Sequence, residues 1–381
     1  MDTGVDETHP DLKGVEIAQK DFSGSKNTVD HVGHGTHVAS ALAGSGAKSG
    51  KHRGVAPGAK ILDAKVLDDE GSGEDSGIIA GMQWAADNGA RVANLSLGGE
   101  DAAEHDPLEA AVDRISAAGG ILFAIAAGNE GPDASTIGSP GSAASALIVG
   151  AVDRKDRIAD FSSTGPTADG SLKPDLTSPG VGIVAAKAAK GTEGTPAAPG
   201  YVSMSGTSMA TPHVAGTAAV LAQRHPGWTG QRIKQALTAS ARPSSGLSPL
   251  QQGTGRTDLA RAITQSVASE QTSVNFGTQL WPHGDDEPLT RRITYRHDGT
   301  EPVTLKLSTE TAGPGEGRPH RPDSSPSAPT ASASPRAAPP GGPHRGHPDR
   351  QSGRRVHRRA RRPGHRGRAE RTYLLRRAAR G

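Results

Sequence analysis

Short apolar runs alternate with longer segments in which apolar residues recur three and four positions apart, from the start of the chain to about residue 263. The short runs are rich in β-branched residues and predict strands at residues 60–66, 91–97, 121–126 and 146–152. The longer segments predict helices at residues 34–43, 76–88, 107–118, 208–224 and 229–240. Strands that alternate with helices favour a parallel sheet. We therefore expect an α/β domain over residues 1–263, doubly wound, with a mostly parallel sheet and helices on both faces.

Residues 264–312 show a different pattern, in which apolar and polar residues alternate over only a few positions at a time. This alternation predicts short strands at residues 274–276, 292–295 and 303–307, separated by turns. About three short strands are too few to close a core. We expect this segment to be a partial β-sandwich.

Residues 313–381 lack a periodic apolar pattern and are rich in Pro, Arg, Gly, Ala and Ser, so we predict that they are disordered. They carry 17 Arg, no Lys and 4 acidic residues, whereas the whole chain has a net charge of +3, so the first 312 residues are acidic. A basic tail can bind polyanions without reading their sequence. No aromatic platform for stacking bases accompanies the arginines. We therefore expect no specific nucleic-acid partner.

The chain contains no Cys, which excludes disulfides, thiolate metal sites and a Cys nucleophile. No apolar run approaches the roughly 20 residues that span a bilayer. Met1 is followed at once by polar Asp2 and Thr3 rather than by a basic and then apolar leader. We expect neither a signal peptide nor a membrane-spanning helix in the sequence as written, and no membrane partner.

Ser208 lies in the motif Gly-Thr-Ser-Met-Ala, at the start of a predicted helix. Free backbone N–H groups at a helix start can meet a developing oxyanion, so this hydroxyl is a candidate nucleophile. A serine that only caps the helix is the alternative.

His34 lies at the centre of the motif His-Val-Gly-His-Gly-Thr-His. A neutral imidazole can accept a serine proton and return it to a leaving amine, because its ordinary pKa is about 6.5. The spacing of His31, His34 and His37 also permits a metal site. However, the zinc-protease pattern requires His at i and i+4 with an intervening Glu, which is absent. We therefore expect no metal at these histidines.

Asp2 opens the motif Asp-Thr-Gly, where Gly4 permits a turn at the carboxyl end of a strand. A buried carboxylate there would hold a histidine tautomer and stabilise the imidazolium. Aspartic proteases need a second carboxylate motif of this kind, and no second Asp-Thr-Gly occurs. An aspartate that only stabilises a turn or a helix cap is the alternative.

Asn129 follows a predicted buried strand in the motif Ala-Ala-Gly-Asn. Its side-chain amide could donate a hydrogen bond to a tetrahedral intermediate. An asparagine that only forms a turn between glycines is the alternative.

These segments occur in the order Asp, His, Asn, Ser, and over residues 1–263 the chain resembles the subtilisin-like serine proteases (subtilases, peptidase family S8). The resemblance implies an endopeptidase that hydrolyses peptide bonds through an acyl-enzyme on Ser208. It implies that Asp2 orients His34, which acts as base and then as acid. It also implies that Asn129 and the Ser208 N–H bind the oxyanion. Polypeptide substrates, a monomer in the extracellular space and no organic cofactor are further implications.

The resemblance also implies a binding site for extended peptides, in which a substrate lies alongside a strand. One side of that site would be formed by Leu95, Ser96, Leu97 and Gly98. The walls of the first specificity pocket would be Ala126, Ala127 and Gly128, with Gly138 at the floor. Large apolar side chains are therefore expected to fit.

The chain departs from the family at its start, because family members have a strand that runs into the catalytic aspartate and only Met1 precedes Asp2 here. We therefore expect an N-terminally truncated peptidase domain in which a central strand is missing. Loss of a buried parallel strand exposes backbone groups and core side chains on both sides. A second hypothesis follows, namely that the chain is a catalytically inactive fragment that binds peptides.

Calcium is not expected at the usual site of the family. The segment His9 to Leu12 resembles one whose aspartate can ligate calcium, but the partner ligands are absent. The acidic turn Asp68 to Glu70 remains a possible place for an ion.

Overall fold

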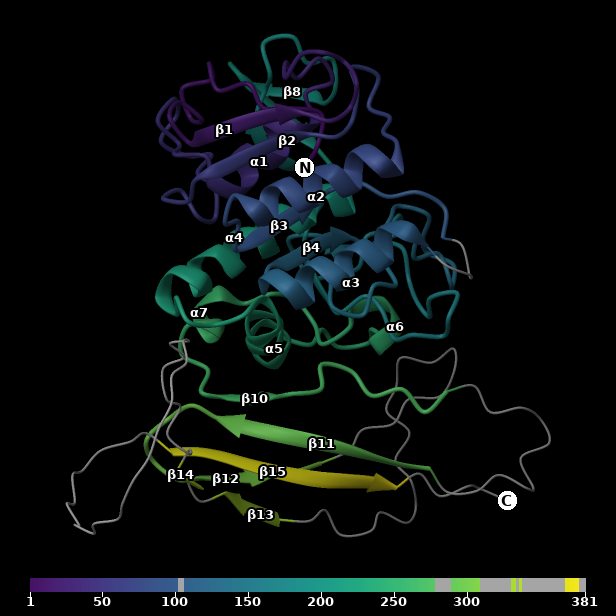
Figure 1. The fold of residues 1–381 in the computed structure, drawn as a ribbon. Coiled ribbons are helices and arrows are strands. Elements are labelled where there is room, and N and C mark those ends of the chain that lie inside the picture. Colours follow the sequence, from purple (N-terminus) through teal and green to yellow (C-terminus); the bar gives the residue numbers. More distant parts are fainter. Residues whose placement is uncertain (102–105, 278–288, 309–329, 334–335, 338–366, 377–381) are drawn as a thin grey trace, which may run out of the picture.

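The computed structural model describes residues 1–101, 106–277, 289–308, 330–333, 336–337 and 367–376 (Figure 1). Two groups of parallel strands form the centre of residues 1–263. One is a pair, β1 (Glu16–Asp21) and β2 (Ile61–Lys65). The other has four parallel strands in the spatial order β3 (Val92–Leu95), β4 (Leu122–Ala126), β5 (Leu147–Val152) and β6 (Leu176–Pro179).

Seven helices accompany these strands within the described residues. They are α1 (His34–Ala43), α2 (Asp75–Asp87), α3 (Pro107–Gly119), α4 (Thr207–Arg224), α5 (Gly230–Ser240), α6 (Pro249–Gln252) and α7 (Leu259–Ala262). The five predicted helices and the four predicted strands of this region are confirmed, each with its ends within two residues of the predicted ones.

Side chains of β4 alternate between the two faces of the sheet, and helices cover both faces. Phe123 and Ile125 pack in one cluster with Met82 of α2 and Val112 of α3. Leu122 packs in a second cluster with residues of α4 and α5. Burial on both faces is characteristic of a parallel sheet, and it explains why these strands are continuously apolar. The prediction of a doubly wound α/β fold is confirmed.

An antiparallel sheet lies between the parallel strands and α4 in the sequence. Its spatial order is β7 (Ile183–Ala186), β9 (Tyr201–Met204) and β8 (Thr195–Ala198). β7 contacts α1, and β9 leads into the start of α4. This connection brings the beginning of α4 to the same part of the molecule as the beginning of α1.

The carboxyl ends of three parallel strands position the candidate residues. Asp2 forms a parallel bridge with Lys65 at the end of β2. Ser96 directly follows β3, and Asn129 lies three residues beyond β4. Because ligands of α/β sheets bind outside the carboxyl ends of the strands, this edge is the expected place for an active site.

β2 and β3 do not pair with each other. In the described part of the chain β2 pairs with β1 and β3 pairs with β4. Between the two groups lie the bridge of Asp2 to Lys65 and the hydrogen bond of the Met1 amine to the Asn94 carbonyl. Figure 1 marks the N-terminus in this region.

Beyond residue 263 the described strands are β10 (Val267–Ser269), β11 (Thr290–His297), β12 (Val303–Lys306), β13 (Thr330–Ala333), β14 (Arg336–Ala337) and β15 (Gly367–Arg376). They form two antiparallel sheets, ordered β10-β11-β15-β14 and β12-β13. The strands predicted at residues 292–295 and 303–307 are found in β11 and β12.

Two expectations for this region differ from the structure. Residues 274–276 form no strand; instead the Asn275 side chain donates a hydrogen bond to the Gly170 carbonyl at 2.7 Å, and the strand that pairs with β11 lies earlier, at β10. β13, β14 and β15 fall within the stretch predicted to be disordered. Backbone pairing of β15 with β11 supplies hydrogen bonds that composition does not reveal. The rest of residues 313–381 lies outside the described residues.

No helix in the described ranges is long and apolar enough to cross a membrane.

Candidate active site

Asp2 and His34 form the centre of the candidate site. Nδ1 of His34 lies 2.7 Å from Oδ1 of Asp2. The Asp2 side chain is buried, while 19% of the His34 side chain is exposed. Oδ1 of Asp2 also accepts a hydrogen bond from the Thr3 backbone N–H at 2.9 Å. A carboxylate held on Nδ1 leaves Nε2 as the ring nitrogen that can take up a proton.

Asp30 fixes the start of α1 and therefore the direction of His34. Its carboxylate accepts hydrogen bonds from the N–H groups of Gly33 and Thr36 at 2.7 and 2.9 Å. It also accepts a hydrogen bond from the Thr3 hydroxyl at 2.8 Å. The side chain is 1% exposed. One buried carboxylate thus ties the helix that carries His34 to the residue that follows Asp2.

Gly35 permits the close approach of α1 to the first residues of the chain. A Cβ atom at this position would lie 2.2 Å from the Gly4 carbonyl oxygen and 3.1 Å from the Asp2 Cβ. Any larger residue would therefore force the two segments apart. The second glycine of the motif Gly-His-Gly is explained by this contact.

Burial and charge act in opposite directions on the pKa values of Asp2 and His34. Burial is the largest influence on each residue and disfavours both charges. The attraction and the hydrogen bond between the two residues outweigh burial, so the pKa of Asp2 is lowered and the pKa of His34 is raised to about 9. The site therefore stabilises the imidazolium that forms when His34 accepts a proton.

Ser208 is the second residue of α4 and is partly exposed. Its hydroxyl donates a hydrogen bond to the Ser96 carbonyl at 3.2 Å, and the Ser96 hydroxyl donates one to the Ser208 carbonyl at 2.8 Å. No hydrogen bond joins Ser208 to His34 in the described part of the molecule. Such bonds are often long in the absence of substrate and form when substrate binds.

Two hydrogen-bond donors lie beside Ser208. The Asn129 side-chain oxygen accepts hydrogen bonds from the Thr207 N–H at 2.9 Å and the Thr207 hydroxyl at 3.1 Å. Because the oxygen of the Asn129 amide accepts these bonds, its NH₂ group is left to donate to another acceptor. The Ser208 N–H is in the first turn of α4, where backbone N–H groups have no partner within the helix. An amide and a backbone N–H next to a nucleophile are what an oxyanion hole requires.

Comparisons with known proteins show which family the chain belongs to. A family model described as "Subtilase family" matches residues 1–272. The chain belongs to the subtilase family. Serine protease AprX of Bacillus subtilis (strain 168) is 40% identical over 262 residues, which are 62% of this chain and 59% of that protein. Subtilisin E of the same organism is 39% identical over 243 residues, with 63% and 59% covered. The chain thus spans about three fifths of the length of these relatives.

Solved structures show the same fold. A cold adapted subtilisin-like serine proteinase superposes with a TM-score of 0.55 at 35% identity, over 68% of this chain and 84% of that one. Sphericase superposes with a TM-score of 0.56 at 32% identity, over 63% and 81%. The resemblance inferred from the sequence motifs is confirmed.

The segments predicted to bind substrate in this subtilase lie next to each other. Gly99 and Ser139 exchange two backbone hydrogen bonds of 3.0 Å, and the Gly138 N–H donates to the Ala127 carbonyl at 3.4 Å. A Cβ atom on Gly138 would lie 2.4 Å from the Gly99 carbonyl oxygen. Gly138 is therefore required for the close contact between the two sides of the predicted site.

The residues of this chain that are predicted to bind substrate differ in how far they are exposed to solvent. Leu95, Ser96, Ala126 and Ala127 are buried, and Leu95 lies in the core cluster beneath α2 and α3. Leu97, Gly128 and Gly138 are partly exposed, and Gly98 is exposed. A peptide could therefore meet the backbone of these segments rather than the Leu95 side chain.

The three histidines of the motif do not converge on a common point. Nε2 of His37 is hydrogen-bonded to the Ile183 carbonyl at 3.0 Å, and burial lowers its pKa to about 4. Nε2 of His31 lies 3.9 Å from an Asp69 oxygen. His34 alone of the three contacts Asp2. In the described residues these histidines form no metal-binding group.

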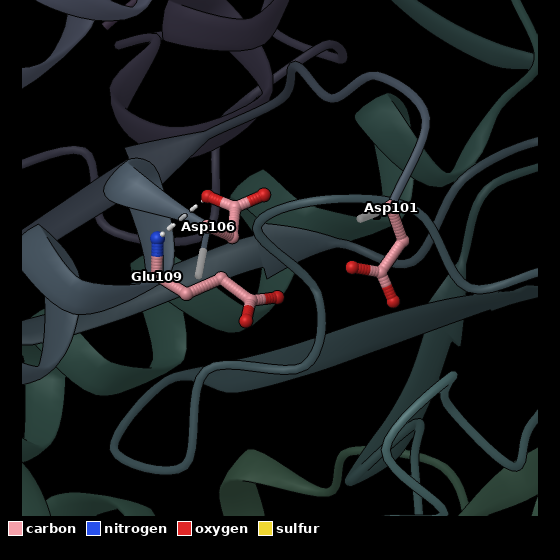
Figure 2. A group of neighbouring side chains, drawn as sticks. All are labelled: Asp101, Asp106 and Glu109. Atoms are coloured by element: carbon pink, nitrogen blue, oxygen red, sulfur yellow. Dashed lines mark hydrogen bonds between the residues drawn. The ribbon is translucent and has the colours of Figure 1, made fainter. Parts of the chain in front are cut away.

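Carboxylates cluster elsewhere in the subtilase, at the start of α3. The side chains of Asp101, Asp106 and Glu109 lie near one another (Figure 2). One ligand atom from each lies within 4.8 Å of the other two. Two of the three already have roles, because Asp106 caps α3 and Glu109 accepts hydrogen bonds from Ser142. Nothing further among the described residues points to an ion at this cluster.

The other acidic positions that were considered for calcium have protein partners. Asp11 accepts hydrogen bonds from the Lys48 N–H and the Tyr201 hydroxyl at 2.8 and 2.7 Å. Asp69 forms an ion pair with Lys65 at 3.0 Å. These contacts explain both carboxylates without a metal.

Proposed function

We propose that this chain is a serine endopeptidase, which hydrolyses polypeptides through an acyl-enzyme on Ser208. The observation that carries the proposal is the 2.7 Å hydrogen bond between buried Asp2 and His34. It supports a general base whose protonated form is stabilised, and it occurs in a chain of the subtilase family. The free amide of Asn129 gives further support.

The first half-reaction would begin with a rotation of the Ser208 hydroxyl from the Ser96 carbonyl to Nε2 of His34. His34 takes the hydroxyl proton while Ser208 Oγ forms a bond to the peptide carbonyl carbon. The developing oxyanion accepts hydrogen bonds from the Asn129 NH₂ group and the Ser208 N–H. His34 then gives the proton to the leaving amine as the C–N bond breaks, which leaves an acyl group on Ser208.

The second half-reaction uses water as the nucleophile. His34 takes a proton from the water, whose oxygen attacks the acyl carbon. The same two donors stabilise the second oxyanion. His34 returns the proton to Ser208 Oγ as the ester bond breaks, and the new carboxylic acid leaves. Asp2 remains ionised throughout and holds the imidazole in place.

Substrates would be extended polypeptide segments. The exposed backbone of Gly98 follows β3 and offers hydrogen-bonding groups to an extended chain. Gly128 and Gly138 have no side chain to narrow the first specificity pocket, which favours large apolar substrate side chains. An extracellular monomer with no bound cofactor is part of the same proposal.

Labelling of the purified chain with a fluorophosphonate tests this proposal, because the reagent forms a bond only with an activated serine. We expect one adduct, mapped to Ser208 by peptide mass spectrometry, and no adduct in Ser208→Ala. Ser205→Ala is a matched control, since Ser205 is exposed and lies three residues away. Absence of labelling in a folded chain would overturn the proposal.

An inactive peptide-binding subtilase is the second candidate. One observation favours it, namely that the Ser208 hydroxyl donates its hydrogen bond to the Ser96 carbonyl rather than to His34. A folded chain that binds a polypeptide but neither cleaves it nor reacts with the fluorophosphonate would support this candidate.

A further inference from the structure

The loop between β7 and β8, residues 187–194, lies against the segment that leads into α1. The N–H groups of Thr192 and Glu193 both donate hydrogen bonds to the Val32 carbonyl, at 2.9 and 3.0 Å. His34 follows two positions after Val32 and is the first residue of α1. The β7–β8 loop therefore borders the candidate site beside the imidazole.

Further contacts hold the β7–β8 loop in place. The Ala189 N–H donates a hydrogen bond to the Asp6 carboxylate at 2.6 Å. Near the other end of the loop, a Cβ atom on Gly194 would lie 3.0 Å from the terminal methyl group of Met204. Met204 ends β9, four residues before Ser208. The loop is thus fixed against the segments that carry both candidate catalytic side chains.

Glu193 places a negative charge on this border. Its side chain is exposed, and it forms no ion pair with a lysine or arginine among the described residues. Burial is the largest influence on the pKa of His34 and lowers it, whereas the charge of Asp2 and, more weakly, that of Glu193 raise it. Neither Lys187 nor Lys190 of the same loop is among the main influences on this pKa. Glu193 is therefore the charge of the loop that acts most on the space beside the imidazole.

The proposed reaction at Ser208 sets which part of a substrate meets this charge. The residue before the cleaved bond would enter the pocket at Gly128, on the side of Ser208 where Asn129 contacts the start of α4. His34 gives its proton to the leaving amine, so that amine and the chain attached to it must lie beside the imidazole. The substrate residue directly after the cleaved bond therefore faces the β7–β8 loop and Glu193.

We propose that Glu193 selects substrates that carry a basic residue directly after the cleaved bond. The inference rests on the proposed peptidase function and adds the substrate class to it. An arginine at that place can offer the two N–H groups of its planar guanidinium to the carboxylate oxygens. A glutamate there is repelled, because like charges at close range disfavour each other. Together with the apolar pocket before the bond, Glu193 favours cleavage between an apolar residue and a basic one.

The test compares blocked, internally quenched peptides that differ only in the residue after the cleaved bond, which is Arg, Gln or Glu. The peptides compete in one solution, so their relative rates give the ratio of their kcat/KM values. Every peptide meets the same enzyme, so the fraction of neutral His34 cancels from the ratio. We expect Arg to exceed Gln by about two- to fivefold, the scale of an ion pair at a protein surface, and Glu to fall below Gln by a similar factor.

Two variants assign the preference to Glu193. Glu193→Gln should bring the three rates together, and Glu193→Lys should reverse their order. Glu70→Gln is the matched control, because it removes one exposed carboxylate from the turn between β2 and α2 and should retain the parent's preference. Equal rates for the three peptides in the parent would overturn the proposal. So would an unchanged preference in Glu193→Gln, or an equal loss of preference in Glu70→Gln.

Fluorophosphonate labelling separates substrate selection from damage to the site. The reagent carries no polypeptide on its leaving side, so Glu193→Gln should react with it at the parent's high-pH rate. A much lower rate would show that Glu193 supports the site itself and would contradict its role in selection. A parent chain that is labelled and cleaves the three peptides equally refutes only the role of Glu193. A folded chain that is not labelled and cleaves none refutes the peptidase function as well.

Discussion

Asp2 holds the ring of His34 at 2.7 Å while its own backbone bonds to Ala64 in β2. The same residue therefore orients the candidate base and attaches the N-terminal segment to the sheet. A change in the pairing at the end of β2 would move the carboxylate relative to α1. This connection makes the position of His34 dependent on both segments.

Fluorophosphonate labelling should depend on pH in a direction set by Asp2. His34 must be neutral to take the Ser208 proton, and Asp2 raises its pKa against the effect of burial. The labelling rate should therefore rise with pH and reach half its maximum above about pH 6.5, the ordinary histidine pKa. In Asp2→Asn burial remains and the negative charge is lost, so the midpoint should fall.

The labelling rate at the high-pH plateau distinguishes the shift in the pH midpoint from simple misfolding of Asp2→Asn. Loss of the corresponding aspartate in serine proteases costs about 10⁴-fold in kcat, which sets the scale for Asp2→Asn. The midpoint is measured from labelling rates between about pH 5 and about pH 10, a range that includes both the ordinary and the raised histidine pKa. Identical midpoints in the two proteins would contradict the assigned role of Asp2.

Removal of the Asn129 amide should lower kcat with little change in KM, because its hydrogen bond is expected only in the transition state. In subtilisin itself, loss of one such donor costs about 10²- to 10³-fold. Asn129→Asp keeps the oxygen that accepts from Thr207 but removes the NH₂ group, so it should lose as much as Asn129→Ala. Glu130→Gln, at the adjacent exposed position, serves as the control. Near-normal kcat in Asn129→Asp would assign Asn129 a structural role only.

Gly35→Ala should damage both stability and the candidate site. The new Cβ would lie 2.2 Å from the Gly4 carbonyl oxygen, and overpacking of this kind costs about 1–3 kcal/mol. The displacement separates Asp2 from His34, so the labelling rate should fall at least about tenfold. Gly58→Ala is the matched control, because a Cβ atom added there would meet no other atom within 4 Å. Urea unfolding and labelling of both variants check the prediction; equal behaviour of the two would refute it.

Asp175 is expected to be essential for stability rather than for catalysis. Its buried carboxylate pairs with Lys173 at 2.8 Å and Lys234 at 3.2 Å. Asp175→Asn leaves two buried ammonium groups without a counter-charge, and loss of one partner from a buried ion pair costs about 3–5 kcal/mol. Asp153→Asn, which removes an exposed pair with Arg157, should leave Tm nearly unchanged.

The pH dependence of unfolding gives a second test of Asp175. Burial raises its pKa, but the two lysines and a backbone hydrogen bond outweigh burial and lower it below 3.8. Its stabilising contribution is therefore complete above the unfolded-state pKa and is lost as pH falls through the lower folded-state value. Acid unfolding that is the same in the parent and Asp175→Asn would be inconsistent with this pairing.

The sequence predicted the helices and parallel strands of residues 1–263 well, and the structure brings Asp2 and His34 together. α1 begins at His34 as the motif indicated, and Asp2 contacts His34 as expected of an orienting carboxylate. These features depend on short-range patterns and on motifs whose order is informative. The match of the family model to residues 1–272 agrees with the family resemblance that the motifs indicated.

Other contacts between distant segments, those of Asp30 and Asn129, were not predicted. Asp30 carries no distinctive spacing, and only the fold shows that its carboxylate caps α1 while accepting from Thr3. The contact of Asn129 with Thr207 joins positions 78 residues apart. An Asp four residues before a predicted helix start was the available signal for Asp30.

Strand prediction failed where a strand depends on its partner. Residues 274–276 alternate in polarity but pair with no strand among the described residues, whereas β15 has little periodicity and pairs with β11 over most of its length. Backbone pairing stabilises a strand through hydrogen bonds that every residue except Pro can make. Alternation therefore located β11 and β12 but not β10 or β15, whose strand character depends on pairing with β11.

Cleavage of a peptide blocked at both ends tests the central claim most directly, because only an endopeptidase can hydrolyse it. The substrate is an internally quenched peptide with an apolar residue before the central bond, acetylated and amidated at its termini. We predict that the purified chain cleaves this central bond and that Ser208→Ala does not. Cleavage at the same rate by Ser208→Ala would contradict the account. So would a folded chain that neither cleaves the peptide nor reacts with the fluorophosphonate.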